Sequence, residues 1–317
     1  MNAAPSSAAA EAVASGSSDS ENTVVVLGSA NIDIVFTVAR IPQPGETLLA
    51  DSADSYPGGK GLNQAVAAAR AGARTVFIGA LGDDENGRAL TGVMADAAIN
   101  RDLVRHSDLP TGQAFIVVDS GGENVIVVAS GANGTVTRLT ETDRKTVAAA
   151  SVLLMQLELP LDVVSEAATV AHVAGTAVIL NAAPAFELTS EVLRSLDYLI
   201  VNEHEACLLG GSDNLHAASG ILAAQVEQVI VTLGSAGSVL WRSGTELARV
   251  PALNVTAIDT TGAGDTYCGA FAAALAEGQQ FEQAATFASA AAALSVQCIG
   301  AVPSVPARAA IERMLTS

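Results

Sequence analysis

The residues best suited to chemistry lie late in the chain, in the run Asp259-Thr260-Thr261-Gly262-Ala263-Gly264-Asp265. Gly262, Ala263 and Gly264 stand at the start of a predicted helix, where consecutive backbone amides can bind an anion. Asp265 follows them directly and could accept a proton from a hydroxyl nucleophile. Alternatively, Asp265 only stabilises the first helical turn through the helix dipole. A dinucleotide-binding fingerprint is not predicted, because Tyr267 stands where a third glycine is required.

A second glycine-rich run, Gly58-Gly59-Lys60-Gly61-Leu62-Asn63-Gln64, comes directly before an alanine-rich helical stretch. Closely spaced glycines allow the backbone to approach a ligand, and the following helix points its first amides at this loop. The run is not a Walker A motif, because Gly-x-x-x-x-Gly-Lys-Ser/Thr is absent. The alternative is a tight turn between strand and helix, with Lys60 in solvent.

Three further polar runs follow predicted strands. Asn31 and Asp33 lie on the same side of an extended segment and could bind two hydroxyls of a sugar, unless they only shape a turn. The run Asn202-Glu203-His204-Glu205 carries carboxylates suited to magnesium, or is a charged helix start. The loop from Thr232 to Gly237 could hold the phosphates or ribose of a nucleotide, or is a plain loop.

Apolar runs alternate with alanine-rich stretches along most of the chain. The predicted strands are Thr23–Leu27, Thr75–Ala80, Val152–Leu157, Ala177–Leu180, Tyr198–Val201 and Val229–Leu233. The predicted helices are Asn63–Ala71, Gly87–Ala98, Leu161–Ala171, Leu215–Ala224, Asp265–Ala276 and Phe281–Val296. This alternation predicts an α/β fold, a doubly wound and mostly parallel sheet with helices on both faces. Ligands of such folds bind outside the carboxyl ends of the strands.

Four predicted strands have no helix between them. Ile32–Val38 and Thr47–Ser55 flank the turn Pro42-Gln43-Pro44-Gly45, and Gln113–Val118 and Asn124–Ala129 form a hairpin around Gly121-Gly122. We predict that they form a small separate sheet, from about residues 32–56 and 111–130, which covers the sandwich as a lid. The domain then spans residues 23–317, after a disordered tail of residues 1–22.

The bulk composition excludes several classes of partner. A formal net charge of -18 opposes binding to nucleic acid or to an anionic membrane surface. The chain shows no signal peptide and no uninterrupted apolar run of about 20 residues, so we predict a cytoplasmic protein. Cys207, Cys268 and Cys298 have no C-x-x-C spacing and are predicted to be reduced.

The order and spacing of these motifs resemble the ribokinase-like, phosphofructokinase-B-type carbohydrate kinases. The resemblance runs from about Val24 to the C-terminus, and its specific motifs are the two glycine-rich runs. Within the family it is strongest to the members that phosphorylate ribose, through Gly28-Ser29-Ala30-Asn31-Ile32-Asp33, Pro44-Gly45-Glu46-Thr47, Met155-Gln156-Leu157-Glu158 and Pro303-Ser304-Val305-Pro306. The resemblance implies ATP-dependent phosphorylation of D-ribose at its 5-hydroxyl.

The resemblance also implies roles for particular residues. Asp265 is the expected catalytic base, beside an anion hole of Gly262, Ala263 and Gly264. The expected sugar pocket consists of Asn31, Asp33, Gly58, Gly59, Lys60, Gly61, Asn63, Glu158 and Asp265. The residues expected at ATP are Asn202, Thr232, Leu233, Gly234, Ser235, Ala236, Gly237, Gly264 and Ser289. Glu205 is expected to organise Mg²⁺ indirectly. A K⁺ site is expected at Asp259, Thr261, Ser295, Cys298, Gly300 and Ser304, partly through backbone carbonyls. The lid implies a homodimer.

The chain departs from the family pattern at two places, of which the first leaves the substrate open and the second should matter little. Gly262 stands where many ribose kinases carry alanine, and Asn181-Ala182-Ala183-Pro184 replaces Asn-Pro-Ala-Pro. The alternatives are a kinase of the same family acting on deoxyribose, fructose, a sugar acid or adenosine, and a non-catalytic sensor of sugars or nucleotides. No arginine lies beside Asn31, Asp33 or Gly58–Asn63, which favours a neutral sugar over a sugar acid.

Overall fold

The computed structural model describes residues 22–316, so the predicted tail lies outside the described residues except for Asn22. Nine strands form the main sheet in the order β13-β12-β11-β10-β9-β8-β1-β4-β5. From β11 to β5 the neighbours pair in parallel, and β12 and β13 add an antiparallel edge. The bounds are β1 Thr23–Leu27, β4 Arg74–Gly82, β5 Asn100–Ser107, β8 Val152–Met155, β9 Ala177–Asn181, β10 Tyr198–Asn202, β11 Gln228–Thr232, β12 Ser238–Arg242 and β13 Thr245–Val250. The predicted α/β fold class is confirmed, and the sequence patterns missed the two edge strands, β5 and β13, and also β12, which lies beside β13.

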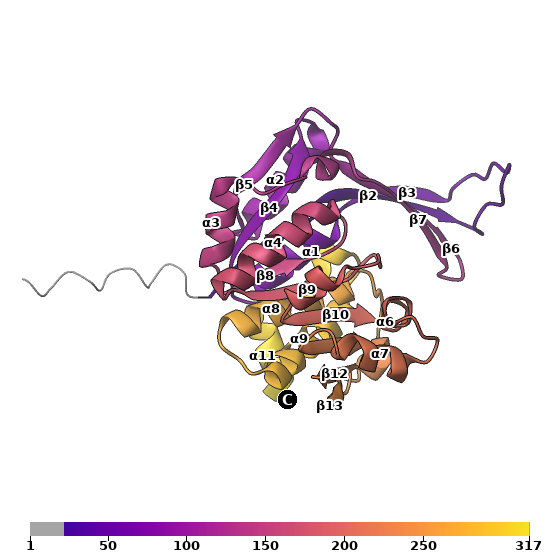
Figure 1. The fold of residues 1–317 in the computed structure, drawn as a ribbon. Coiled ribbons are helices and arrows are strands. Elements are labelled where there is room, and N and C mark those ends of the chain that lie inside the picture. The colour runs from indigo at the N-terminus through magenta and orange to yellow at the C-terminus, as the bar shows by residue number, and fades with distance from the viewer. Residues whose placement is uncertain (1–21, 317) are drawn as a thin grey trace, which may run out of the picture.

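Both faces of this sheet are apolar, because successive side chains of a strand point to opposite sides. In β1, Val24 and Val26 pack into one core cluster and Val25 and Leu27 into the other. The first cluster lies under α1 (Lys60–Arg70), α2 (Glu85–Asp96), α8 (Ala263–Ala276), α9 (Phe281–Ser295) and α11 (Arg308–Thr316). The second lies under α3 (Glu141–Ala149), α4 (Leu161–Ala174), α5 (Ser190–Arg194), α6 (Glu203–Gly210) and α7 (Leu215–Ala223). Figure 1 shows the two helical layers on either side of the sheet. Within residues 22–316, no helix is both long and apolar enough to cross a membrane.

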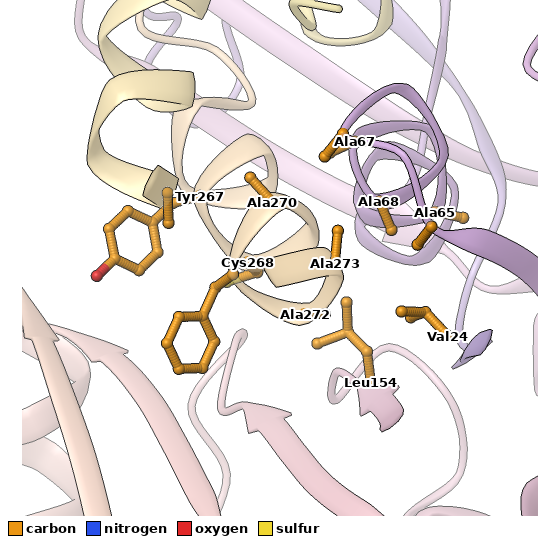
Figure 2. Close-up of a cluster of buried hydrophobic side chains, with 14 of the residues drawn as sticks. Val24, Ala65, Ala67, Ala68, Leu154, Tyr267, Cys268, Ala270, Ala272 and Ala273 are labelled. Atoms are coloured by element: carbon orange, nitrogen blue, oxygen red, sulfur yellow. The ribbon is translucent and has the colours of Figure 1, made fainter. Parts of the chain in front are cut away.

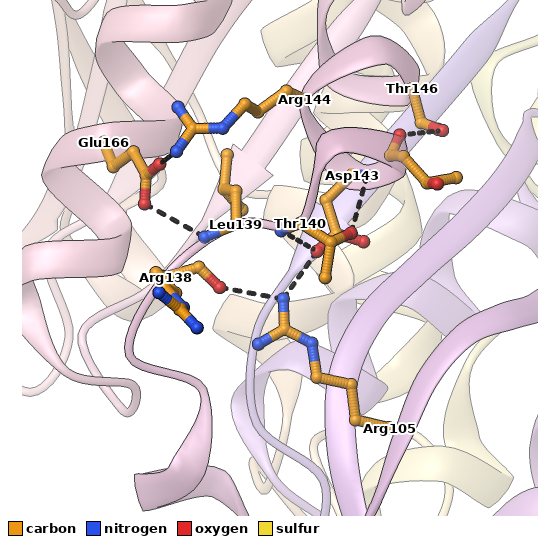
Figure 3. A network of polar contacts seen from close by, with 9 residues as sticks. Arg105, Arg138, Leu139, Thr140, Asp143, Arg144, Thr146 and Glu166 are labelled. Carbon is orange, nitrogen blue, oxygen red and sulfur yellow. Dashed lines mark hydrogen bonds and ion pairs between the residues drawn. The ribbon is translucent and has the colours of Figure 1, made fainter.

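Polar contacts at the start of α3 tie it to both neighbouring elements (Figure 3). Thr140 and Asp143 form a reciprocal capping box, which satisfies two backbone amides at the helix start. Arg105 of β5 donates to the Asp143 carboxylate at 2.5 Å. On the other side, Glu166 of α4 pairs with Arg144 and accepts the Leu139 amide at 3.0 Å. These contacts fix the edge strand β5 and α4 against the start of one short helix.

A second, four-stranded sheet stands apart from the first, in the order β3-β2-β6-β7. Its strands are β2 (Asn31–Val38), β3 (Ser52–Gly58), β6 (Gly112–Asp119) and β7 (Asn124–Ala129), and in Figure 1 it projects from the side of the sandwich. The predicted strand Thr47–Ser55 is wrong at both ends. Pairing of Asn31 with Gly58 and of Thr37 with Ser52 carries β3 into the glycine-rich run. Thr47–Asp51 is irregular and mostly exposed, because it belongs to the connection between β2 and β3.

Small side chains allow α1 and α8 to pack closely over the first core cluster. Figure 2 shows Ala67 and Ala68 of α1 near Ala270 and Ala273 of α8. At Gly269, a Cβ atom would lie 2.3 Å from the Gln64 carbonyl oxygen and 2.5 Å from the Ala67 Cβ. The contact is therefore possible only with glycine at this position of α8.

We predict that Gly269→Ala destabilises the fold by about 1–3 kcal/mol, because overpacking forces the two helices apart. The matched control is Gly92→Ala in α2, where a Cβ would meet no atom within 4 Å. That substitution should instead stabilise the protein by about 0.5–1 kcal/mol, through helix propensity alone. Urea denaturation of both variants measures the difference, and equal effects of the two would contradict the close packing.

Candidate active site at the carboxyl ends of the strands

The centre of the site is the Asp265 carboxylate, in the first turn of α8. Its side chain is held from α1, where Asn63 Nδ2 donates to Oδ2 at 3.0 Å and Gln64 Nε2 donates to Oδ1 at 2.9 Å. Asp265 is 8% exposed, so it still reaches the surface of the site. Stabilisation of its own helical turn does not explain this arrangement, because the hydrogen bonds of its carboxylate cross to another helix.

Open space and free amides lie beside Asp265. Among residues 22–316, no acceptor takes the backbone N–H groups of Gly264 and Asp265. A Cβ at Gly264 would meet no atom within 4 Å, so this helix end is uncovered. The Ala263 amide is occupied, because it donates to the Thr260 carbonyl at 3.2 Å. Gly262 has φ +73°, and a Cβ there would lie 2.7 Å from the Ala301 Cβ, which explains glycine at this turn.

The first three backbone amides of α1, in the other glycine-rich run, are not free. Lys60 N donates to Glu158 Oε2 at 3.1 Å, Gly61 N to Ser29 Oγ at 3.4 Å and Leu62 N to the Ser29 carbonyl at 2.9 Å. Ser29 Oγ also donates to Glu158 Oε2. The expectation that the first amides of α1 are free is therefore wrong for these three residues. The Lys60 amide and the Ser29 hydroxyl instead hold the Glu158 carboxylate at the start of α1.

The glycines of this run make room for neighbouring segments. A Cβ at Gly58 would lie 2.0 Å from Asp33 Oδ2, and one at Gly61 would lie 2.5 Å from the Ser29 amide nitrogen. Gly59 has φ +87°, which favours glycine at the start of α1. The run thus brings Asp33 and Glu158 close to the start of the helix that carries Lys60 and Asn63.

Four charged side chains interact around this helix start. Burial, then repulsion from Glu158 and Asp265, raises the pKa of Asp33 to about 7, although Lys60 opposes the shift. Burial lowers the pKa of Lys60, but attraction to Asp265, Glu158 and Glu205 outweighs it and raises this pKa overall. Lys60 is only partly exposed, so the alternative of a lysine free in solvent is wrong. The site combines one cation with carboxylates that can accept hydroxyl hydrogens.

Asn31 lies deeper than Asp33, at the start of β2. It is 1% exposed, and its Oδ1 accepts from Asn133 Nδ2 at 2.8 Å. Asn133 belongs to the 3₁₀ helix η1 (Gly131–Thr135) and also bonds the backbone of Ala30 at 3.1 and 3.2 Å. Nothing in the sequence pattern singled out Asn133, because it lies about 100 residues along the chain from its partner Asn31. Asn63 Oδ1 is buried and has no partner within the described residues.

The residues predicted to meet a nucleotide lie along the neighbouring strands β10 and β11. Asn202 stands directly opposite Thr232 in the parallel register of these strands. Asn202 and Glu205 form a capping box for α6, with both hydrogen bonds at 2.8 Å, so their local role is that of a helix start. Glu205 is 9% exposed, and burial raises its pKa.

The loop after β11 is closed by a hydrogen bond of 2.7 Å from Leu233 N to the Gly237 carbonyl. Between them lies the short 3₁₀ helix η2 (Gly234–Ala236), whose Ser235 and Ala236 are exposed. Ser289 of α9 lies at this side of the site, since its Oγ is 3.5 Å from the carbonyl of Pro251, which follows β13.

The residues predicted to bind K⁺ come together from two segments. Ile258 N donates to the Val296 carbonyl at 2.7 Å, and Asp259 accepts the Thr261 amide at 2.9 Å and the Gly300 amide at 2.7 Å. Cys298 is exposed, and Ser304 lies in the short helix α10 (Ala301–Ser304), where its Oγ donates to the Ala301 carbonyl at 2.8 Å. In the part of the chain that the structure describes, no group of three or more His, Cys, Asp or Glu side chains could hold a metal ion.

Comparison with known proteins identifies the family of this chain. The model of the pfkB family of carbohydrate kinases matches residues 21–308. Ribokinase of Haemophilus influenzae is 42% identical over 294 residues, which cover 90% of this chain and 96% of the relative. Ribokinase of Bacillus subtilis is 38% identical over 297 residues, 92% of this chain and 99% of the relative.

Solved structures agree with these sequence relatives. Arabidopsis thaliana ribokinase, complexed with ribose and ATP, superposes with a TM-score of 0.87 and 35% identity, over 94% of this chain and 99% of that one. Thermotoga maritima ribokinase gives a TM-score of 0.85 at 37% identity, over 94% of this chain and 100% of that one. The family match and the identities of these relatives show that the chain belongs to the pfkB family of carbohydrate kinases.

Proposed function

We propose that this chain transfers the γ-phosphoryl group of ATP to the 5-hydroxyl of D-ribose, giving ribose 5-phosphate and ADP. The observation that carries the proposal is the Asp265 carboxylate, held by two donors beside the open amides of Gly264 and Asp265. The ribokinase relatives supply the substrate, since they match almost the whole chain. A non-catalytic sensor would not require a carboxylate and an uncovered helix start at one point.

Asp265 is the proposed catalytic base. It accepts the proton of the 5-hydroxyl as the oxygen attacks the γ-phosphorus, while the bond from phosphorus to the β-phosphate oxygen breaks in line. The amides of Gly264 and Asp265 take up negative charge on the transferring group, as helix starts do for anions. The two hydrogen bonds from α1 keep the carboxylate oriented, so little reorganisation is required during the reaction.

The other end of the sugar is assigned to the group around Asp33, Lys60 and Glu158. Their carboxylates accept hydroxyl hydrogens, and Lys60 and Asn63 offer a cation and an amide to the sugar oxygens. Asn63 Oδ1, which is buried and has no partner among residues 22–316, is a further acceptor beside the Asp265 carboxylate. Asn31 belongs to the same pocket, held there through Asn133.

ATP is assigned to the edge formed by Asn202, Thr232 and the loop to Gly237, with Ser289 behind it. Mg²⁺ fits here as an ion bound mainly by ATP phosphates and water, because Glu205 already uses one of its carboxylate oxygens to cap α6. When bound, Mg²⁺ would neutralise phosphate charge. K⁺ fits the carbonyl groups of the paired segments at Asp259–Thr261 and Ser295–Gly300, beside the start of α8.

The second sheet is the proposed lid and the proposed dimer interface. Strand β7 is exposed on both faces, with Val125, Ile126, Val127 and Val128 between 44% and 61% exposed. Exposed apolar residues on an edge strand usually mark a surface that another chain covers. A second copy of the chain, pairing through the same sheet, accounts for this composition.

We predict that Asp265→Asn folds normally and lowers kcat for ribose by about 10²–10⁴-fold, because the proton acceptor is lost. Coupled ADP release measures the rate, over ribose, deoxyribose, fructose and adenosine. The control is Asp213→Asn, which alters an exposed carboxylate far along the chain from Asp265. Near-normal turnover of Asp265→Asn would remove the proposed base, and a preference of the unmodified protein for another acceptor would remove ribose as the substrate.

We predict that ribose binding weakens as the pH falls below about 7. The raised pKa of Asp33 leaves its carboxyl neutral below that pH, so a proton competes with the sugar hydroxyl for the carboxylate. The Kd for ribose should therefore rise by about tenfold for each pH unit below about 7, and should level off above it. Calorimetric titration from pH 5.5 to 8.5 tests this. Asp33→Asn should bind weakly with little dependence on pH, and a flat profile for the unmodified protein would contradict the role of Asp33.

We predict that Val127→Lys converts a dimer into a monomer, because a charge at the proposed interface raises the dimer Kd by roughly 100-fold. Size-exclusion chromatography with light scattering, at micromolar protein, measures the mass. Val173→Lys on α4 is the control, since Val173 is also an exposed valine, at 82%. If both variants keep the same mass as the unmodified protein, β7 is not the interface.

A further inference from the structure

A chain of buried amide groups leads from β8 to the Asp265 carboxylate. Gln156, directly after β8, donates from Nε2 to Gln64 Oε1 at 2.6 Å. Gln64 in turn donates from Nε2 to Asp265 Oδ1 at 2.9 Å and to Asn181 Oδ1 at 3.0 Å. Gln64 and Gln156 are both 0% exposed. Their side chains are therefore out of reach of a substrate, although Gln64 contacts the proposed base.

The direction of these hydrogen bonds follows from the chemistry of their ends. A carboxylate only accepts, so Gln64 must turn its NH₂ group towards Asp265. Asn181 presents its oxygen to the same group, because its Nδ2 donates to the Ile200 carbonyl at 3.2 Å. Gln64 Oε1 then faces the other way and requires a donor, which Gln156 supplies. If Gln64 were rotated by half a turn, its oxygen would face the Asp265 carboxylate.

The position of Gln156 costs free energy. Its Oε1 is buried and finds no donor within residues 22–316, and such an atom normally costs about 1–3 kcal/mol. The side chain is also confined, because a Cβ at Gly28 would lie 2.2 Å from this oxygen. An arrangement that lowers stability and for which a glycine leaves room is typical of functional sites rather than of core packing.

We propose that Gln64 and Gln156 are positioning residues for Asp265. Gln156 fixes the orientation of the Gln64 amide, and Gln64 fixes the rotation of the Asp265 carboxylate, so that Oδ2 stays directed at the sugar hydroxyl with Asn63. The inference rests on the proposed function, because it assumes that Asp265 is the base. It adds two residues of the sugar-kinase site that touch neither substrate.

The first test uses Gln64→Met, Gln156→Met and the double variant, since methionine keeps the length and volume of glutamine. Loss of a hydrogen bond to a charged group should lower kcat of Gln64→Met by about 10–100-fold. The KM for ATP should change by less than about twofold, because neither residue lies at the nucleotide edge. Gln156→Met should lose less, about 3–10-fold. Gln225→Met, an exposed glutamine of the same type, is the control and should match the unmodified protein.

The double variant separates positioning from general damage to the core. If Gln156 acts only through Gln64, the double variant should be no slower than Gln64→Met alone. Losses that multiply would show two independent structural effects and would overturn the proposal. A kcat for Gln64→Met within threefold of the unmodified protein, with Asp265→Asn inactive, would overturn it too, while leaving the proposed function intact. Absence of ribose phosphorylation by the unmodified protein would instead contradict the proposed function.

The second test is Gln64→Glu, which keeps the shape but places a carboxylate against Asp265. Two carboxylates at this distance share a proton. The acidic limb of the dependence of kcat on pH should therefore move to higher pH by more than about one unit. The other charged or titratable groups around Asp265 are unchanged in this variant and face it from several elements: Asp33, Lys60, Glu205 and Cys268. An acidic limb at the same pH as in the unmodified protein would show that Gln64 does not act on Asp265. This measurement can still be made if Gln64→Met does not fold.

Discussion

The site depends on a carboxylate held in a largely buried position between two helices. Asp265 starts α8, and its two oxygen atoms accept one hydrogen bond each from Asn63 and Gln64 of α1. A buried charge of this kind is tolerated only when its hydrogen bonds are satisfied. The close packing of α1 on α8 at Gly269 keeps these donors in reach. Displacement of either helix would leave the carboxylate buried without these two donors.

Glycines act in this protein mainly as spacers between crossing segments. Gly58 leaves room for the Asp33 carboxylate, and Gly61 for the backbone at Ser29. Gly264 is different, because the space beside it is open and its amide has no acceptor among the described residues. The two glycine-rich runs thus look alike in the sequence but differ in role. The run at Gly58–Gly61 allows neighbouring segments to pack closely, and the run at Gly262–Gly264 leaves the start of α8 uncovered.

Electrostatics links the two ends of the proposed sugar pocket. Lys60 interacts with Asp265, Glu158 and Glu205, which lie on three separate elements. Its attraction to these carboxylates keeps the lysine charged despite burial. For Asp33, attraction to Lys60 is too weak to offset burial and repulsion from Glu158 and Asp265, which raise its pKa to about 7. The pocket therefore contains one carboxyl group, that of Asp33, whose pKa is raised well above its ordinary value.

Much of the fold follows from local patterns in the chain. The apolar runs predicted six of the parallel-sheet strands, and the hairpin around Gly121-Gly122 matches β6 and β7. Such elements depend on side-chain periodicity and turn residues, which are local. The edge strands β5 and β13 were missed, because half-exposed strands carry mixed polar residues and a weak apolar pattern.

The sequence by itself determined the residues that carry the chemistry: Asp265, the glycines before it, and the polar residues at the ends of β1 and β10. Tertiary structure alone decided their partners. Gln64, Gln156, Asn133 and Asn181 are ordinary amides in the sequence, and their roles arise from hydrogen bonds between residues more than a dozen positions apart. Side-chain amides have no spacing rule along the chain, because each finds its partner only when helices and strands from distant segments pack together. The same reason explains why the amides at the start of α1, which looked free in the sequence, are occupied by Ser29 and Glu158 in the folded protein.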